Sequence, residues 1–189
     1  MKTTIFNTPI LTNILRRLAE ILLRLAGWKT EGHLPDLPKC VVIGAPHTSN
    51  WDFVLMLALG FSERATLRFM GKAELFRSPL AFFFYWCGGI PVERSKSTGL
   101  VEQVTQAIQQ SERFILIITP EGTRKKVREW KSGFYRIAKS ANIPVVLAYI
   151  DGKRKVVGIG KTFTLTDNME TDMQAIQSFY AGLEGINPR

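Results

Sequence analysis

The sequence is poor in the residues that build disulfide scaffolds and metal sites. Its 189 residues include only two cysteines and two histidines. Cys40 and Cys87 lie in apolar runs and form no C-x-x-C pair, so we expect two small buried hydrophobic side chains rather than a disulfide or a zinc site. The sequence therefore predicts no metal or other cofactor, and a reducing, cytoplasmic environment is the simpler interpretation.

The sequence also lacks an uninterrupted apolar run of membrane-spanning length. Apolar residues recur at helical spacing over 11–25, but four charged side chains interrupt them: Arg16, Arg17, Glu20 and Arg24. A transmembrane helix needs about 20 mostly apolar residues, and a secretory signal needs an unbroken apolar stretch. Residues 1–30 are therefore interpreted as an amphipathic, membrane-associating helix with a basic face. The same pattern would also suit a helix that packs on the domain core.

Acidic residues are outnumbered. The chain has 25 Lys and Arg against 16 Asp and Glu, which gives a net charge of +9. This surplus favours anionic partners such as phospholipid headgroups, nucleotide phosphates, an acidic carrier protein or nucleic acid. No nucleic-acid-binding motif accompanies the basic runs at 124–126 and 153–155. We therefore expect no nucleic-acid partner and prefer anionic lipid or an acidic carrier.

What the chain does contain is an alternation of strand-like and helical patterns. Strands are expected at 40–43, 67–70, 90–92, 114–119, 143–150 and, as strand or hairpin, 155–165; helices are expected at about 50–60, 97–110 and 131–141. This alternation is typical of a single α/β domain, over 31–189, whose mixed sheet is flanked by helices. The apolar run 80–87 is too short to span a bilayer and fits either a core helix or a surface wall for an acyl chain or lipid.

The first motif that can carry chemistry is Pro-His-Thr-Ser-Asn-Trp-Asp at 46–52. It follows a buried strand and opens a helix, so His47 is expected at the end of the strand with Asp52 about one helical turn further on. A carboxylate there can accept a hydrogen bond from one ring nitrogen, which leaves the other nitrogen able to take a proton. Such a pair could activate a substrate hydroxyl directly. A capping histidine beside a solvated aspartate is the alternative interpretation.

Two further motifs place arginines after strands. Thr-Pro-Glu-Gly-Thr-Arg at 119–124 follows a strongly β-forming run, where ligands bind in open α/β sheets. Gly122 permits an unusual turn there, and Arg124 can grip a phosphate in a bidentate fork. Gly-Gly-Ile-Pro-Val-Glu-Arg at 88–94 places Arg94 beyond an extended segment, as a second cation for a phosphate. Each motif alone also fits an ordinary turn with a solvent-facing arginine.

Together these motifs resemble the glycerolipid acyltransferases, most closely the 1-acyl-glycerol-3-phosphate acyltransferases. Four blocks of that family are matched in order: His-x-x-x-x-Asp at 47–52, the arginine of the second block at Arg94, Pro-Glu-Gly-Thr-Arg at 120–124, and an Ile-Pro-Val strand at 143–145. They extend over about residues 40–150, and an ordered set is far more specific than any one motif. The fourth block lacks its usual second proline, which leaves the acceptor open.

The resemblance implies the reaction and its partners. An acyl group would pass from acyl-CoA or an acidic acyl carrier protein, which are co-substrates rather than cofactors, to a hydroxyl of a lysophospholipid such as 1-acyl-glycerol-3-phosphate. His47 would be the general base and Asp52 its orienting partner, with the acceptor's phosphate held by Arg94 and Arg124. The rest of the third block would shape that phosphate site: Glu121, Gly122 and Thr123. Backbone N–H groups where the helix after His47 begins would be candidates for stabilising the oxyanion.

The resemblance further implies a peripheral protein on the cytoplasmic face of the cell membrane. Two other functions fit the same motifs. A thioesterase would use His47 and Asp52 on water, and a non-catalytic lipid-binding module would use neither. The presence of a base together with its orienting carboxylate argues against the binding module, because such a module needs no such pair.

Overall fold

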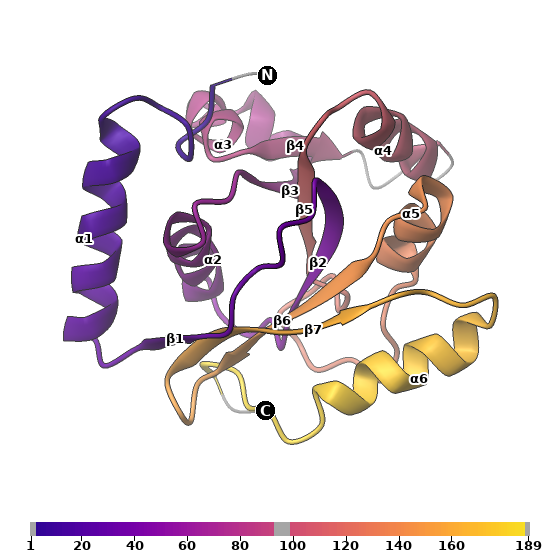
Figure 1. Cartoon of the computed structure of the whole chain (residues 1–189). Coiled ribbons are helices and arrows are strands. Elements are labelled where there is room, and N and C mark those ends of the chain that lie inside the picture. The colour runs from indigo at the N-terminus through magenta and orange to yellow at the C-terminus, as the bar shows by residue number, and fades with distance from the viewer. Residues whose placement is uncertain (1–2, 93–98, 188–189) are drawn as a thin grey trace.

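The apolar runs of the sequence assemble into one twisted sheet (Figure 1). The computed structural model describes residues 3–92 and 99–187 of the chain. Within them, seven strands pair in the order β1-β7-β6-β2-β5-β3-β4. The strand bounds are Lys29–Glu31 (β1), Lys39–Ala45 (β2), Leu67–Lys72 (β3), Gly89–Val92 (β4), Phe114–Ile118 (β5), Val145–Asp151 (β6) and Val156–Phe163 (β7).

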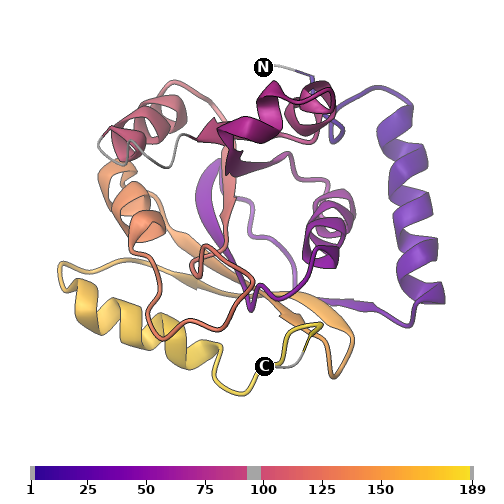
Figure 2. The ribbon, with the colours of Figure 1, turned by 180° about the vertical axis from the view of Figure 1, so that it is seen from behind.

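Neighbouring strands run parallel except for β6 and β7, which are antiparallel. The helices are α1 (Leu11–Leu25), α2 (Trp51–Ser62), the short 3-10 helix η1 (Ala73–Arg77), α3 (Ala81–Trp86), α4 (Leu100–Gln109), α5 (Gly133–Ala141) and α6 (Met169–Phe179). Helix α2 covers one face of the sheet, with α1 outside it, while α4, α5 and α6 lie on the other (Figures 1 and 2). The predicted class, an α/β domain with a mixed sheet flanked by helices and an N-terminal helix, is confirmed.

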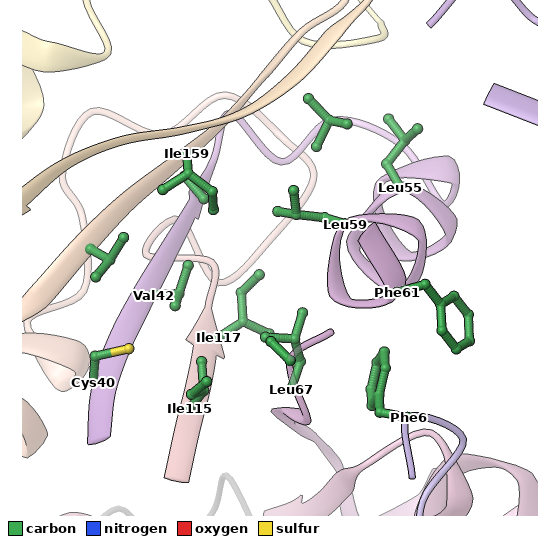
Figure 3. Packing of buried hydrophobic residues seen from close by; sticks show 14 of the residues in the cluster. Phe6, Cys40, Val42, Leu55, Leu59, Phe61, Leu67, Ile115, Ile117 and Ile159 are labelled. Carbon is green, nitrogen blue, oxygen red and sulfur yellow. The ribbon is translucent and has the colours of Figure 1, made fainter. Parts of the chain in front are cut away.

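Alternating side chains of the central strands belong to two separate hydrophobic cores, one on each face of the sheet. On β2, Cys40 and Val42 point into the core under α2, whereas Val41 and Ile43 point into the core under α4 and α5. Figure 3 shows the α2 side, where Leu55 and Leu59 of that helix meet the strand residues. A strand buried on both faces needs a continuous apolar run, which is why β2 and β5 are recognisable in the sequence.

Strand β1, the short 3-10 helix η1 and helix α6 were not predicted from the sequence. Strand β1 has only three residues and pairs with β7 at the sheet edge, where its side chains stay largely exposed. Helix α6 buries only Asp172 and Ile176, so its apolar pattern is weak. Its start is marked instead by Asn168, whose side chain accepts a hydrogen bond from the Thr171 amide at 3.1 Å. This N-cap, followed by acidic residues in the first turn, is the signal that could have revealed the helix.

Helix α1 is apolar on two adjoining sides. Leu15, Ala19 and Leu23 face inward and pack against the core that α2 covers. A second set of apolar side chains remains exposed and is called here the outer stripe: Ile10, Ile14, Leu18, Ile21, Leu22 and Leu25. At about 100° per residue, the charged residues fall on the remaining side of the helix. The helix therefore does pack on the domain, and membrane contact by its outer stripe stays a prediction. No helix in the described part of the chain is long and apolar enough to cross a bilayer.

Candidate active site

The site lies where β2, β5 and β6 end together. These three strands are parallel neighbours, so the loops that leave their carboxyl ends share one edge of the sheet. The loop 46–50 leads from β2 into α2, and the loop 119–132 leads from β5 to α5. The motifs at 46–52 and 119–124 lie far apart in the sequence, with 74 positions between His47 and Glu121. The order of the strands brings them side by side.

The structure places His47 and Asp52 in direct contact. The Nδ1 atom of His47 lies 2.8 Å from Oδ2 of Asp52. The same oxygen accepts hydrogen bonds from the backbone amides of Thr48 and Ser49, at 2.7 and 2.9 Å. Asp52 is buried, and its other oxygen, Oδ1, has no hydrogen-bond partner among the described residues. With Nδ1 donating to the carboxylate, Nε2 is the imidazole atom that carries the lone pair.

The backbone of His47 is held by the motif at 119–124. Its amide donates a 2.8 Å hydrogen bond to Oε1 of Glu121, whose side chain is buried. The Glu121 carboxylate thus supports the histidine loop, and its expected part in shaping a phosphate site stays a prediction. Together with the bonds to Asp52, the bond to Glu121 commits the amides of residues 47–49 to carboxylates. These three amides already have acceptors, and the expectation that backbone N–H groups near the start of α2 stabilise an oxyanion stays a prediction.

The rest of the motif at 119–124 lies beside the histidine loop. Gly122 has a φ of +64°, a left-handed conformation that favours glycine, and a Cβ there would lie 3.0 Å from the Lys131 side chain. Thr123 is half-buried, while the exposed Arg124 donates a hydrogen bond to the Asn50 side chain in the histidine loop. The predicted phosphate ligand Arg94 lies outside the described residues.

A cavity of about 760 Å³ opens beside His47 and Asp52. Its lining residues come from both faces of the sheet. Apolar side chains line one side, among them Phe53 and Met56 of α2 and Ile150 of β6. The other side includes two exposed cations, Lys131 and Arg136. The Lys131 amide bonds to the Pro120 carbonyl at 2.9 Å, so the fold ties this cation to the motif at 119–124.

The last described segment of the chain braces the histidine loop. The Asn187 side chain donates to the Thr48 carbonyl at 3.0 Å, and the Asn187 amide donates to Oγ1 of Thr48 at 3.1 Å. Gly185 packs so closely that a Cβ would come within 2.2 Å of the Thr48 side chain. Residues 184–187 are called here the C-terminal brace. No motif in the sequence pointed to it, because its contacts depend on tertiary structure alone.

Burial raises the pKa values of two ionisable groups, Tyr180 and Cys40. Burial, together with the nearby negative charge of Glu121, raises the pKa of Tyr180 well above its ordinary value. The Tyr180 hydroxyl lies 3.1 Å from the carbonyls of Ile43 and Ala148, near the ends of β2 and β6. Burial also raises the pKa of the Cys40 thiol to about 12, so this side chain is a packed hydrophobe and not a nucleophile.

Comparison with known proteins identifies the family. The sequence pattern of the family described as Acyltransferase matches residues 29–151, about two thirds of this chain. The matched segment contains His47, Asp52 and the motif at 120–124. The chain belongs to the Acyltransferase family. Helix α1 and the C-terminal brace of this acyltransferase-family protein lie outside the matched segment.

Two relatives show how far the likeness extends. The acyltransferase-family chain is 30% identical over 148 residues to a probable 1-acyl-sn-glycerol-3-phosphate acyltransferase of Mycoplasma pneumoniae, which covers 72% of this chain and 54% of that protein. It thus spans about half the length of the curated relative that it matches. The crystal structure of the 1-acyl-sn-glycerophosphate (LPA) acyltransferase PlsC from Thermotoga maritima superposes with a TM-score of 0.66 over 89% of this chain and 76% of that one. At 18% identity this likeness shows a shared fold.

The described residues contain no group of three or more potential metal ligands among His, Cys, Asp and Glu side chains. The described site offers an imidazole–carboxylate pair, the cations Lys131 and Arg136 and a cavity with apolar walls. Such a set suits proton transfer and the binding of an anionic, partly apolar substrate.

Proposed function

We propose that this protein transfers a fatty acyl chain from a thioester carrier to a hydroxyl of a phosphate-bearing lysolipid. The donor is acyl-CoA or an acyl carrier protein, and 1-acyl-glycerol-3-phosphate is the first candidate for the acceptor. The observation that carries the proposal is the 2.8 Å contact between His47 and Asp52 at the edge of a cavity with apolar walls and a cationic rim. The family match and the curated relative support the same reaction class.

The proposed reaction begins with proton transfer from the acceptor hydroxyl to Nε2 of His47. The oxygen then attacks the thioester carbonyl and forms a tetrahedral intermediate, while Asp52 stabilises the imidazolium. Collapse of the intermediate breaks the carbon–sulfur bond, and the imidazolium returns its proton to the departing thiolate. The products are the ester and the free thiol. The enzyme forms no covalent intermediate, so its contribution is base catalysis and the positioning of two substrates.

The charges of the site suit the proposed acceptor. Lys131 and Arg136 line the cavity, and Arg124 donates a hydrogen bond to Asn50 in the histidine loop. A phosphate bound among these side chains would anchor the polar end of the lysolipid with its hydroxyl near His47. The apolar wall formed by Phe53, Met56 and their neighbours would accommodate hydrocarbon. Arg94, expected as a further phosphate ligand, remains part of this proposal.

The proposal also includes a location. The acceptor lipid and its product reside in a bilayer, and α1 presents the apolar outer stripe beside the cations Arg17 and Arg24. An exposed apolar stripe bordered by arginines suits a helix that lies in the interfacial region of a membrane. We therefore place the protein peripherally on the cytoplasmic face of the cell membrane.

The test is a transfer assay with a histidine variant and a matched control. Purified protein is incubated with one long-chain acyl-CoA and a panel of lysolipids, and the products are identified by mass spectrometry. We expect an acylated lysolipid from wild type and at least a thousandfold loss of rate in His47→Ala, because the base is gone. His33, the other histidine, is exposed on a loop with its ring 3.4 Å from Glu63, so His33→Ala should retain full activity.

Other outcomes would identify the alternative functions. Acyl-CoA consumption that is independent of lysolipid and yields only free fatty acid would show a thioesterase. Binding of lipid without turnover by any combination of substrates would show a binding module. Near-full transfer by His47→Ala, with the fold verified by circular dichroism, would overturn the proposed mechanism.

A further inference from the structure

A second exposed apolar surface lies on η1 and α3. Five large side chains within eleven residues are exposed: Leu75 38%, Leu80 62%, Phe82 79%, Phe83 41% and Tyr85 47%. They are called here the aromatic patch. Single exposed apolar side chains are ordinary on a protein surface, but a cluster of this density marks a contact site. Nothing in the reaction proposed above uses these residues.

The aromatic patch is supported from beneath and therefore has a fixed shape. The buried ring of Phe76 packs against Tyr85, with ring centroids 4.8 Å apart, and against Phe84 at 6.0 Å. Phe76 itself rests on Gly71 and Gly89, where a Cβ would come within 2.9 and 2.6 Å of its ring. Bulkier residues at these glycines would displace Phe76. The exposure of the patch is thus built into the packing of η1 and α3.

The aromatic patch is joined to the start of α1. The Ile5 amide donates to the Trp86 carbonyl at 2.8 Å, and the indole N–H of Trp86 donates to Oγ1 of Thr8 at 3.0 Å. These bonds fasten α3 to the segment that ends at Ile10, the first exposed residue of the outer stripe. Both views place α3 beside the segment that leads into the N-terminal end of α1 (Figures 1 and 2). Two apolar surfaces from distant parts of the sequence therefore meet at one corner of the molecule.

We propose that the aromatic patch is a second bilayer contact, which acts with the outer stripe of α1 to dock the protein on an anionic lipid surface. The inference rests on the proposed function, because a lysolipid acceptor must be drawn from a membrane. Phenylalanine and tyrosine are suited to the boundary between headgroups and acyl chains. Lys72 and Arg77 are exposed at the edge of the patch, with one acid, Glu74, between them. This local surplus and the net charge of +9 favour anionic headgroups over a neutral surface.

Two contacts with the bilayer fix the orientation of the domain on the membrane, which one helix alone does not. A single interfacial helix leaves the domain free to rotate about the helix axis, whereas a second contact defines the plane of the membrane. Met70 and Gly71 line the cavity, and only Lys72 separates them from η1, which carries Leu75. The aromatic patch is therefore continuous in sequence with the cavity wall. A bilayer seated on it would lie next to the strand that borders the substrate site.

The test measures binding to vesicles made of equal parts phosphatidylcholine and phosphatidylglycerol. Phe82→Ser combined with Phe83→Ser should weaken partitioning about tenfold or more, because two apolar rings no longer leave water. Ile14→Ser combined with Leu18→Ser, on the outer stripe, should weaken it comparably. Met169→Ser, which changes an exposed apolar side chain on α6, is the matched control and should bind as wild type does. Circular dichroism checks that each variant is folded.

The following results separate the inference from its alternatives. Unchanged vesicle binding by the Phe82/Phe83 variant would overturn it. A change from dimer to monomer in sedimentation velocity, without a change in vesicle binding, would make the patch a self-association surface and would also overturn it. The same variant should retain wild-type transfer between short-chain, water-soluble substrates without vesicles. If the patch mediates binding but no lysolipid is acylated by wild type, the docking inference stands and the proposed function fails.

Discussion

The carboxylate of Asp52 organises the histidine loop through a single oxygen. Oδ2 receives the His47 ring and the amides of Thr48 and Ser49, all within 2.9 Å. Convergent donors of this kind stabilise a negative charge, and the charge in turn orients the imidazole. One buried side chain thus fixes both the direction of the ring and the path of the backbone that carries it.

Asp52→Asn should separate these two effects. The amide oxygen can still accept from the backbone, but the charge that stabilises the imidazolium is lost. We expect the transfer rate to fall on the order of a hundredfold to ten-thousandfold and the free energy of unfolding to fall by about 2 kcal/mol. Initial-rate kinetics and urea unfolding measure the two. A variant with wild-type rate would show that the carboxylate serves the loop alone.

Glu121 should act by positioning His47 rather than by touching substrate. Glu121→Ala removes the acceptor for the His47 amide, so we expect kcat to fall on the order of tenfold to a hundredfold with little change in the KM for lysolipid. Glu121→Gln keeps an acceptor oxygen and should restore much of the rate. The KM for lysolipid, measured for both variants, decides the matter: a rise in KM with unchanged kcat would instead indicate contact with the acceptor.

At the scale of secondary structure, the sequence predicted those elements whose pattern is dictated by burial. The runs at 40–43 and 114–119 lie in strands covered on both faces, and their continuous apolar character leaves few alternatives. Among the missed elements, β1 and α6 bury little and so leave a weak pattern. The apolar run 80–87 was ambiguous because pattern alone does not say whether a helix faces the core or solvent, and α3 exposes most of its rings.

In the candidate site, too, local contacts were predicted from the sequence and contacts between distant segments were not. The spacing of His47 and Asp52 predicted their contact, since a loop that opens a helix brings positions five apart within reach. Contacts between distant segments were not predictable. The bond from His47 to Glu121 joins residues 74 positions apart, and the bonds from Asn187 to Thr48 join residues 139 apart. No local pattern records such pairs, because they arise only when the strands take their order in the sheet.

The C-terminal brace should influence turnover although it lies outside the matched family segment. Asn187→Ala removes the donor to the Thr48 carbonyl and loosens the loop next to His47. We expect kcat to fall roughly three- to tenfold, while stability falls by about 1 kcal/mol, the worth of one hydrogen bond. Asn13→Ala, at an exposed position on α1, is the matched control. Loss of stability with an unchanged kcat would show that the brace supports the fold without tuning the site.

At the scale of the whole molecule, charge and apolar surface should contribute separately to membrane association. The net charge of +9 attracts anionic headgroups over a distance set by salt, whereas the outer stripe and the aromatic patch act only on contact. Raising the salt concentration from 0.1 M to 1 M shortens the screening length from about 10 Å to about 3 Å. It leaves apolar burial intact.

Binding of wild type to phosphatidylglycerol-containing vesicles should therefore fall steeply as salt rises and then level off at a residual value. The residual value reports the apolar contacts, so it should be lower in the Phe82→Ser/Phe83→Ser variant, while the salt-dependent part keeps its slope. Cosedimentation at a series of salt concentrations measures both components. Binding that vanishes in high salt would mean that headgroup charge alone holds the protein. Binding that is insensitive to salt would mean that the basic surface has another partner, with the acidic acyl carrier protein as the first to examine.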